Sequence, residues 1–372
     1  MPLNKAVLFC VTCLALLCLI TSCRKPEPVR LGFVGGLSGR GADLGIAGRN
    51  GALLAIEQAN AAGGINNRPI ELVMNDDHQD PVTARAAITE LINQKIECII
   101  GPMTSSMAAA MLPVINQSDS ILLSPTVTTT SLTGKDDNFI RVVADTKTYA
   151  EKSARFQYAE NGRRRVAAIY DSDNQSYSES WFTDFRNEFA RLGGKVVQTE
   201  TFRSSDNTIF TAKVKALLNS KPDLVLVIAN SLDAAMICQQ IRKINRAVPI
   251  VMSDWASTER FIELAGAASE GVYVTQLLDR NDRSENYLLF RKAYMDRFGH
   301  EPGFAGLAAY DAARIALEAT SARKGNESIK QAILRKKQFQ CVQQMLDIDT
   351  FGDANRKTYL SRVINGLYST QE

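Results

Sequence analysis

The chain has 372 residues, of which 45% are hydrophobic and 22% are charged, and its formal net charge is only +3. These are ordinary values for globular domains, and the length suits two lobes of about 150 residues better than one core. The balanced charge, without a long basic stripe, argues against a nucleic-acid partner.

The first 23 residues have the organisation of an export signal. Lys5 precedes an apolar run from Ala6 to Ile20, which is shorter than the roughly 20 residues that span a bilayer. The run ends at Ile-Thr-Ser-Cys23, which resembles the lipobox of bacterial lipoproteins, in which the cysteine is lipidated. We therefore predict a signal peptide over residues 1–22, a lipid anchor on Cys23 and an extracytoplasmic location, at a periplasmic membrane face or the cell surface. Ordinary signal cleavage beside an incidental cysteine is the alternative.

A Pro-containing tether over residues 23–28 leads into alternating short apolar and longer amphipathic runs. The first series predicts strands at Val29–Gly35, Ile70–Asp76, Ile96–Ile100 and Ile121–Leu123, and helices at Gly45–Ala62, Pro81–Gln94 and Ser105–Gln117. After a break near residues 141–146, the second series predicts strands at Val166–Tyr170, Leu224–Ile228, Ile250–Met252 and Val272–Gln276, and helices at Tyr177–Leu192, Leu232–Arg246 and Thr258–Leu264. Two further helices are predicted at Tyr287–Phe298 and Phe304–Ala322. The alternation predicts an α/β protein with two similar three-layer lobes on parallel sheets.

Hydroxyl groups follow two neighbouring strands, at the sheet edge where ligands of open α/β sheets bind. Thr104, Ser105 and Ser106 open a predicted helix, whose free backbone N–H groups and positive dipole end suit a carboxylate. Plain N-capping is the alternative, since Ser and Thr are common caps. The second loop, Ser124–Ser131, contains Thr126 and Thr128 and offers further hydroxyls to the same ligand, with a solvated turn as its alternative.

Four acids, Asp76, Asp77, Asp171 and Asp254, also stand at predicted strand ends. We expect loop-holding roles for the first two, whereas Asp254 could face an ammonium group. Trp255 beside it is a candidate to pack on the ligand or in the core, and Tyr177 could reach the cleft from the second lobe.

Signals for enzyme chemistry are weak. The two histidines, His78 and His300, have no metal-ligand spacing, and no nucleophile elbow, dinucleotide fingerprint or Walker A sequence is present. Cys98, Cys238 and Cys341 remain after the signal, allow at most one disulfide, and suggest no metal site; Cys98 is expected to be buried. We therefore expect no metal and no cofactor.

An ordered set of motifs carries a family resemblance. They are Gly35-Gly-Leu-Ser-Gly39, Gly45, Gly63-Gly-Ile65, Asp76-Asp77, Asp80-Pro81, Gly101, Ser105-Ser106, Ser124-Pro125, Arg141, Glu270-Gly-Val272, Ala309-Tyr-Asp-Ala312 and Phe351-Gly-Asp353. The chain resembles the leucine/isoleucine/valine-binding protein family of extracytoplasmic solute receptors. The resemblance implies a periplasmic-binding fold of class I with three hinge crossings. It assigns residues 29–141 plus 277–335 to one lobe, and residues 142–276 plus 336–372 to the other.

The resemblance also implies roles for the candidate residues. Ser105 matches a serine that holds the ligand carboxylate, Thr128 a threonine that assists it, and Thr126 a residue whose carbonyl accepts from the ammonium. Tyr177 matches a tyrosine that closes from the second lobe, and Asp254 aligns, across a one-residue gap, with the acid that pairs with the ammonium. Two departures concern the walls of the site, because Leu44 and Asn230 stand where the branched-chain receptor has tyrosines. Gln79 and Thr104 replace a disulfide of that receptor.

The sequence therefore predicts a lipid-anchored solute receptor, not an enzyme, that traps an amino-acid-like ligand and hands it to the permease subunits of an ABC importer. We expect a monomer on a membrane, with no nucleic-acid partner. A sensory receptor of the same fold coupled to a membrane signalling protein is the first alternative, and an extracytoplasmic enzyme of two α/β lobes is the second.

Overall fold

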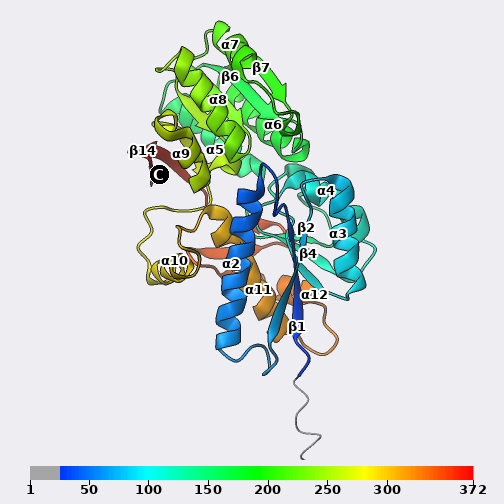
Figure 1. Ribbon diagram of the computed structural model, residues 1–372. Helices are drawn as coiled ribbons and strands as arrows, with labels where there is room; N and C mark the ends of the chain where they lie inside the picture. The colour runs from blue at the N-terminus through cyan, green and yellow to red at the C-terminus, as the bar shows by residue number, and fades with distance from the viewer. Residues whose placement is uncertain (1–25, 372) are drawn as a thin grey trace, which may run out of the picture.

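The computed structural model describes residues 26–371, so the predicted signal peptide and Cys23 lie outside the described residues. The chain forms two α/β lobes, one above the other in Figure 1. Each lobe has its own sheet, with helices on both faces.

The first lobe is built on a parallel five-stranded sheet in the order β2-β1-β3-β4-β5. Its strands are β1 (Val29–Gly35), β2 (Ile70–Asp76), β3 (Cys98–Ile100), β4 (Ile121–Ser124) and β5 (Phe139–Arg141). Its helices are α2 (Ala42–Ala61), α3 (Pro81–Asn93), α4 (Ser105–Ile115), α10 (Glu285–Phe298), α11 (Phe304–Ser321) and α12 (Ile329–Lys336). Leu31 and Phe33 pack against the face that carries α2 and α11, whereas Val34 points to α3 and α4. Burial on both faces explains the continuous apolar runs.

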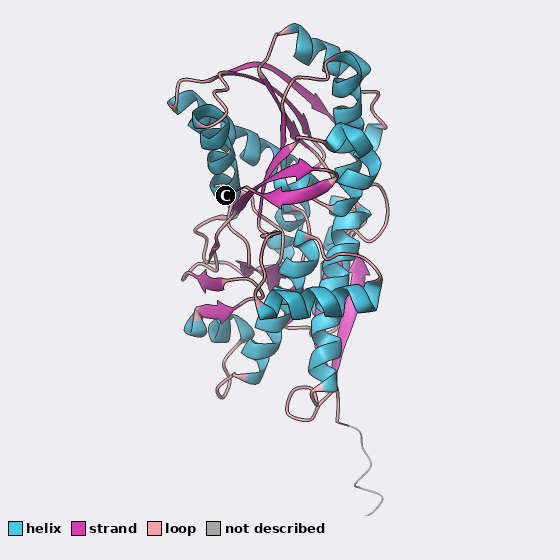
Figure 2. Cartoon of the chain, turned by 90° about the vertical axis from the view of Figure 1, so that its left-hand side faces the viewer, coloured by secondary structure: helices cyan, strands magenta, loops and turns pink. Residues whose placement is uncertain are grey.

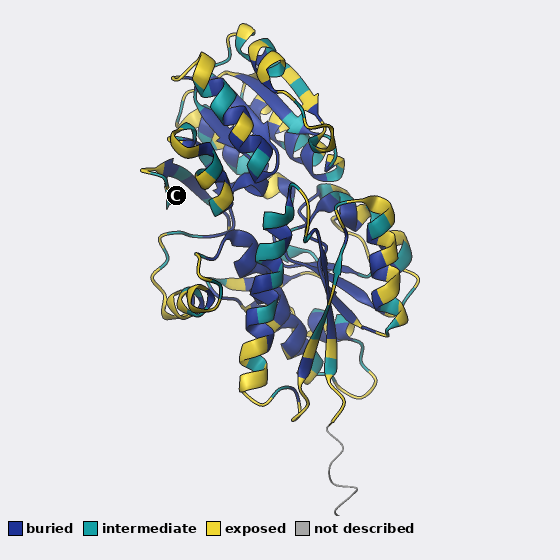
Figure 3. Cartoon of the chain, in the orientation of Figure 1, coloured by how far each residue is buried: buried dark blue, intermediate teal, exposed yellow. Residues whose placement is uncertain are grey.

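The second lobe has a seven-stranded mixed sheet in the order β15-β14-β10-β9-β8-β6-β7. Its strands are β6 (Arg165–Asp171), β7 (Lys195–Phe202), β8 (Leu224–Ile228), β9 (Ile250–Met252), β10 (Tyr273–Gln276), β14 (Tyr359–Ile364) and β15 (Leu367–Thr370). Its helices are α5 (Thr146–Ala159), α6 (Gln175–Arg191), α7 (Thr211–Asn219), α8 (Ser231–Ile244) and α9 (Glu259–Ala265). The first five strands in chain order are parallel, as predicted, but β14 and β15 join antiparallel. In Figure 3 the buried sheets lie between helices whose outer faces are exposed.

A small antiparallel sheet lies apart from both large sheets (Figure 2). It consists of β11 (Gln338–Gln340), β12 (Met345–Ile348) and β13 (Ala354–Asn355). The sequence analysis assigned this segment to the second lobe, whereas the structure connects it to β5 of the first. Arg141 there donates its backbone N–H to Gly352 at 3.0 Å and forms an ion pair with Asp353 at 2.6 Å. Only β14 and β15 of the C-terminal segment extend the second sheet.

The chain passes between the lobes three times, at residues 142–145, 277–284 and 356–358, which agrees with the predicted class of fold. A buried ion pair connects two of these passages. Arg356, 2% exposed, donates Nη1 to the carbonyl of Val142 at 3.0 Å and Nη2 to Asp311 of α11 at 2.5 Å. Since both charges are buried, removal of one would leave the other without compensation.

Candidate functional site

The first half of the site is the start of α4. Thr104 is the N-cap residue, and its side chain makes no capping hydrogen bond. Ser105 is 1% exposed, and its Oγ finds no hydrogen-bond partner among residues 26–371. A buried hydroxyl without a partner is costly, so this group is available to a ligand rather than used as a cap.

The Ser124–Ser131 loop is fastened to the loop before α4. Ser124 Oγ donates to the carbonyl of Pro102 at 2.9 Å, and Thr126 Oγ1 donates to the carbonyl of Met103 at 2.7 Å. Thr128 is buried, its carbonyl accepts from the N–H of Thr146 at 2.6 Å, and its Oγ1 has no partner in the described chain. The two hydroxyl-rich loops therefore form one rigid unit.

The second half of the site is centred on Asp254, which opens the short 3-10 helix η3 (Asp254–Ala256) after β9. Tyr177 Oη and Trp181 Nε1 of α6 donate to Asp254 Oδ1 at 2.7 and 3.1 Å. No hydrogen bond from residues 26–371 reaches Oδ2. Burial raises the pKa of Asp254 to about 6, although both donors oppose the rise. A cation at Oδ2 would restore the ionised form.

Tyr177 connects this acid to the aromatic wall. Burial, together with the charge of Asp254, raises the pKa of Tyr177 well above 10, so its hydroxyl stays protonated and donates. The same oxygen accepts from the N–H of Trp255 at 3.3 Å, and the two rings meet edge to face at 5.6 Å. The positions of the acid and of both aromatic side chains are thus fixed without a ligand.

The two halves enclose a pocket with about 250 Å³ of atom-free space, near the lower end of the range for small-molecule sites. Both lobes contribute to its walls. The lining residues are Leu44, Met103, Thr104, Ser105, Thr126, Asn174, Tyr177, Asp254, Trp255 and Phe304. Hydroxyls and a helix N-terminus on one side and a carboxylate on the other are suited to a small zwitterion.

Direct bonds between the lobes show that the cleft is closed. Asn174 Oδ1 accepts from the N–H of Ser106 at 3.1 Å, beside the pocket. Thr130 and Ser180 share a hydroxyl–hydroxyl bond of 2.8 Å. Further out, Arg40 of the first lobe forms an ion pair with Asp233 of α8 at 2.5 Å.

Six of the eight ligand-site residues predicted from the sequence lie in this pocket: Leu44, Ser105, Thr126, Tyr177, Asp254 and Trp255. Thr128 is not among the lining residues. Asn230 also lies elsewhere, because it caps α8 by accepting from the N–H of Asp233 and donates to Ser204 and to the carboxylate of Asp233. It therefore belongs to a polar cluster on the second lobe.

Sequence reasoning missed Met103, Asn174 and Phe304 as pocket residues. Phe304 starts α11, about 200 positions after Ser105, and an apolar residue at a helix start carries no functional signal. Asn174 precedes α6, directly after the strand-end acid Asp171, so inspection of strand ends could have found it.

The remaining strand-end acids have structural partners. Asp76 accepts from the N–H groups of Leu37 and His78, and Asp77 from that of Gln79. Asp171 accepts from Ser204. The loop-holding role expected for Asp76 and Asp77 is therefore confirmed.

The three cysteines within residues 26–371 are buried and unpaired, and burial raises the pKa of Cys98 and of Cys238 to about 12. Over the same residues, no cluster of metal-ligating side chains occurs. None of the described helices has both the length and the apolar character that crossing a membrane requires.

Comparisons with known proteins agree with this geometry. A family model described as periplasmic binding protein matches residues 28–366. A leucine-, isoleucine-, valine-, threonine- and alanine-binding protein of Pseudomonas aeruginosa is 24% identical over 250 residues, which cover 67% of this chain and 66% of that protein. The Leu/Ile/Val-binding protein of Escherichia coli K12 is 23% identical over 251 residues, 67% of this chain and 68% of the relative. The chain thus spans about two thirds of the length of these relatives.

Solved structures extend the likeness over almost the whole chain. The branched-chain amino acid substrate-binding protein LivJ of Streptococcus pneumoniae, in complex with isoleucine, has a TM-score of 0.86 at 24% identity, covering 92% of this chain and 99% of that one. A solute-binding protein of Rhodopseudomonas palustris in complex with benzoate has a TM-score of 0.84 at 18% identity, covering 93% and 96%.

Proposed function

Because this chain belongs to the periplasmic binding protein family, we propose that it captures a small amino-acid-like solute between its lobes and delivers it to an ABC transporter. The family match confirms the resemblance and the two-lobed α/β fold predicted from the sequence. It also confirms that the chain is a binding protein rather than an enzyme.

The pairing of Ser105 with Asp254 across one closed pocket carries this proposal. The unpartnered Ser105 hydroxyl and the free N–H groups at the start of α4 bind the ligand carboxylate, and Asp254 Oδ2 binds its ammonium. Each charge-assisted hydrogen bond contributes about 1.5–3 kcal/mol, so four or five of them, less ordering costs, give an affinity near −8 kcal/mol, which is micromolar.

Asp254 favours a zwitterion over a simple carboxylic acid such as the benzoate of the Rhodopseudomonas neighbour. A carboxylate ligand alone would place a second negative charge near a buried acid and give it no cation. An α-amino acid supplies that cation at Oδ2. The apolar side chains of Leu44, Met103 and Phe304 are suited to a small, uncharged ligand side chain.

Delivery and location complete the proposal. We place the protein outside the cytoplasm, held to a membrane by a lipid on Cys23, as a monomer that presents its closed form to permease subunits. The names of the relatives support amino-acid transport, and the lipobox-like Ile-Thr-Ser-Cys23 supports the anchor.

A thermal-shift screen of the twenty amino acids and of small carboxylates, including benzoate, tests the function. We expect the melting temperature to rise with one or a few uncharged amino acids and not with their des-amino acids. A shift with simple carboxylates alone would contradict the zwitterion, and no shift with any compound would contradict the solute class.

A further inference from the structure

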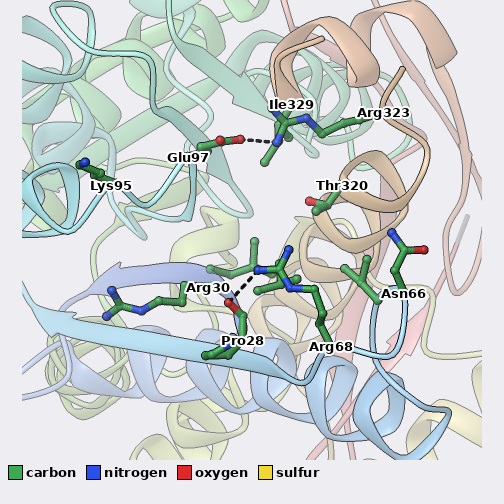
Figure 4. Close-up of a pocket in the computed structure, with 12 residues that line it drawn as sticks. Pro28, Arg30, Asn66, Arg68, Lys95, Glu97, Thr320, Arg323 and Ile329 are labelled. Carbon is green, nitrogen blue, oxygen red and sulfur yellow. Dashed lines mark hydrogen bonds and ion pairs between the residues drawn. The ribbon is translucent and has the colours of Figure 1, made fainter. Parts of the chain in front are cut away.

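A second cavity lies at the far end of the first lobe from the ligand pocket, where the described chain begins. Pro28, Val29 and Arg30 of the N-terminal segment line it, together with residues from the loops after α2 and α3 and from α11 and α12. Its volume is about 340 Å³. Figure 4 shows Arg68 and the Arg323–Glu97 pair on opposite sides of it.

The lining is rich in positive charge. Four cationic side chains, Arg30, Arg68, Lys95 and Arg323, face one carboxylate, Glu97. The ammonium of Lys95, an exposed residue in the turn after α3, has no ion-pair or hydrogen-bond partner within residues 26–371. The whole chain carries a net charge of only +3, so this concentration is local.

The three guanidinium groups are held in place through part of their nitrogens. Arg68 donates Nε and Nη2 to the carbonyls of Glu27 and Pro28, and Arg323 donates Nε to the carbonyl of Glu327 and Nη1 to Glu97. Arg30 donates Nη2 to Gln94, and its Nε lies 3.3 Å from Glu71. One terminal nitrogen of each arginine is not used by the described chain.

Such pre-positioned donors suit a phosphate. Arginine binds phosphate oxygens in a planar, directional manner, and little side-chain entropy is lost when the group is already fixed. The neighbouring Lys95 adds a mobile point charge.

The position of the cavity specifies where that phosphate would come from. Pro28, which lines the cavity, is five residues after Cys23, and five residues span at most about 18 Å. A lipid on Cys23 would therefore hold this end of the first lobe within reach of head groups.

We propose that this cavity binds the phosphate of anionic phospholipid head groups and seats the base of the first lobe on the membrane. The location rests on the proposed anchor at Cys23; binding of the solute does not depend on it. A seated base would leave the ligand cleft, at the opposite end of the lobe, directed away from the bilayer surface (Figure 1).

Vesicle co-sedimentation tests the proposal with residues 26–372, which contain the whole described fold and no lipid anchor. We expect binding to equimolar phosphatidylglycerol–phosphatidylcholine vesicles, none to phosphatidylcholine alone, and a loss of binding at high salt. Lys95→Glu changes two charges, and at about fivefold for each it should weaken binding by roughly twenty-five-fold. The matched control is Lys215→Glu, an exposed lysine on α7 at the far end of the second lobe, which should bind like the unmodified chain.

Several results would overturn the proposal: no binding to anionic vesicles, equal loss in Lys95→Glu and Lys215→Glu, or equal binding to neutral vesicles. Saturable competition by millimolar glycerol phosphate as strong as that of vesicles would mark a soluble phosphate ligand instead of a membrane. The thermal-shift response to amino acids, measured on the same samples, shows separately whether the proposed solute binding holds and whether the variants are folded.

Discussion

The two sides of the ligand pocket are prepared in different ways. On the first lobe, Ser105 and Thr128 are buried with hydroxyls that nothing in the described chain satisfies. On the second lobe, Asp254 already accepts from Tyr177 and Trp181, and Tyr177 is in turn held by the backbone of Trp255. One side lacks its partner, whereas the other is assembled in advance.

This difference shows how binding energy would be distributed. The acid is oriented before the ligand arrives, so little ordering cost remains on the second lobe. The hydroxyl side gains most from the ligand, since unsatisfied buried groups become paired. Closing of the lobes around a zwitterion therefore satisfies the first lobe and neutralises the second.

The largest effect is expected where the two sides are joined. Arg356→Met leaves the Asp311 carboxylate buried without a cation, and we expect a loss of about 3–5 kcal/mol in the free energy of unfolding. Chemical denaturation measures it. The double variant Asp311→Leu/Arg356→Met should recover much of the loss, and the exposed pair is the control: Arg297→Met, which removes the partner of Glu57, should cost about 1 kcal/mol or less. A single variant as stable as wild type would contradict the role of this pair.

The prepared acid is the next test. Asp254→Asn keeps an acceptor for Tyr177 and Trp181 but removes the charge, so affinity for the amino acid found in the screen should fall at least thirtyfold, about 2 kcal/mol. Calorimetry measures the affinity. The control is Asp171→Asn, a strand-end acid bonded to Ser204 outside the pocket, and it should bind normally. Equal affinities in wild type and Asp254→Asn would remove the acid from the site.

The unsatisfied hydroxyl should contribute less. Ser105→Ala removes one charge-assisted hydrogen bond, and we expect about a tenfold loss of affinity with unchanged or slightly higher stability, because a buried unpaired group disappears. Ser328→Ala is a matched serine change at the capping box of α12, and it should lower stability without changing affinity. Reversal of these two patterns would identify Ser105 as structural.

The pH dependence follows from Asp254. Its pKa of about 6 in the free protein means that the carboxylate is mostly ionised at pH 7 and mostly protonated at pH 5. Since the ammonium binds the ionised form and lowers that pKa further, affinity should fall about tenfold from pH 7 to pH 5. Titrations at both values measure this, and Asp254→Asn should show a flat profile. A flat profile in the wild type would contradict an ionised Asp254 in the complex.

Most of the fold could be predicted because its strands are buried on both faces. Strands such as β1, β2, β8 and β9 agree with the predicted bounds residue for residue. Helix α5 was missed because its buried face contains Ser153, Ala154 and Gln157, which give little apolar periodicity. Strand β7, at the sheet edge, and β14 and β15 were also missed, since short or half-exposed strands carry a weak pattern.

The site divides in the same way. Ser105 and Thr126 could be found because they follow strands directly, and Asp254 because it is the single carboxylate near the end of β9. Trp181 as a donor to Asp254, and Phe304 as a wall, depend on contacts between distant segments that no local pattern records. Asn230, expected in the wall by resemblance, instead caps α8, because an asparagine before a helix satisfies the free N–H of Asp233.

The most direct test is calorimetric titration of wild type and Asp254→Asn with the best amino acid from the screen and with its des-amino acid. The account predicts that the wild type strongly prefers the amino acid and that the variant loses this preference, because the carboxylate of Asp254 is what recognises the ammonium. A variant that distinguishes the two ligands as well as the wild type does would contradict it.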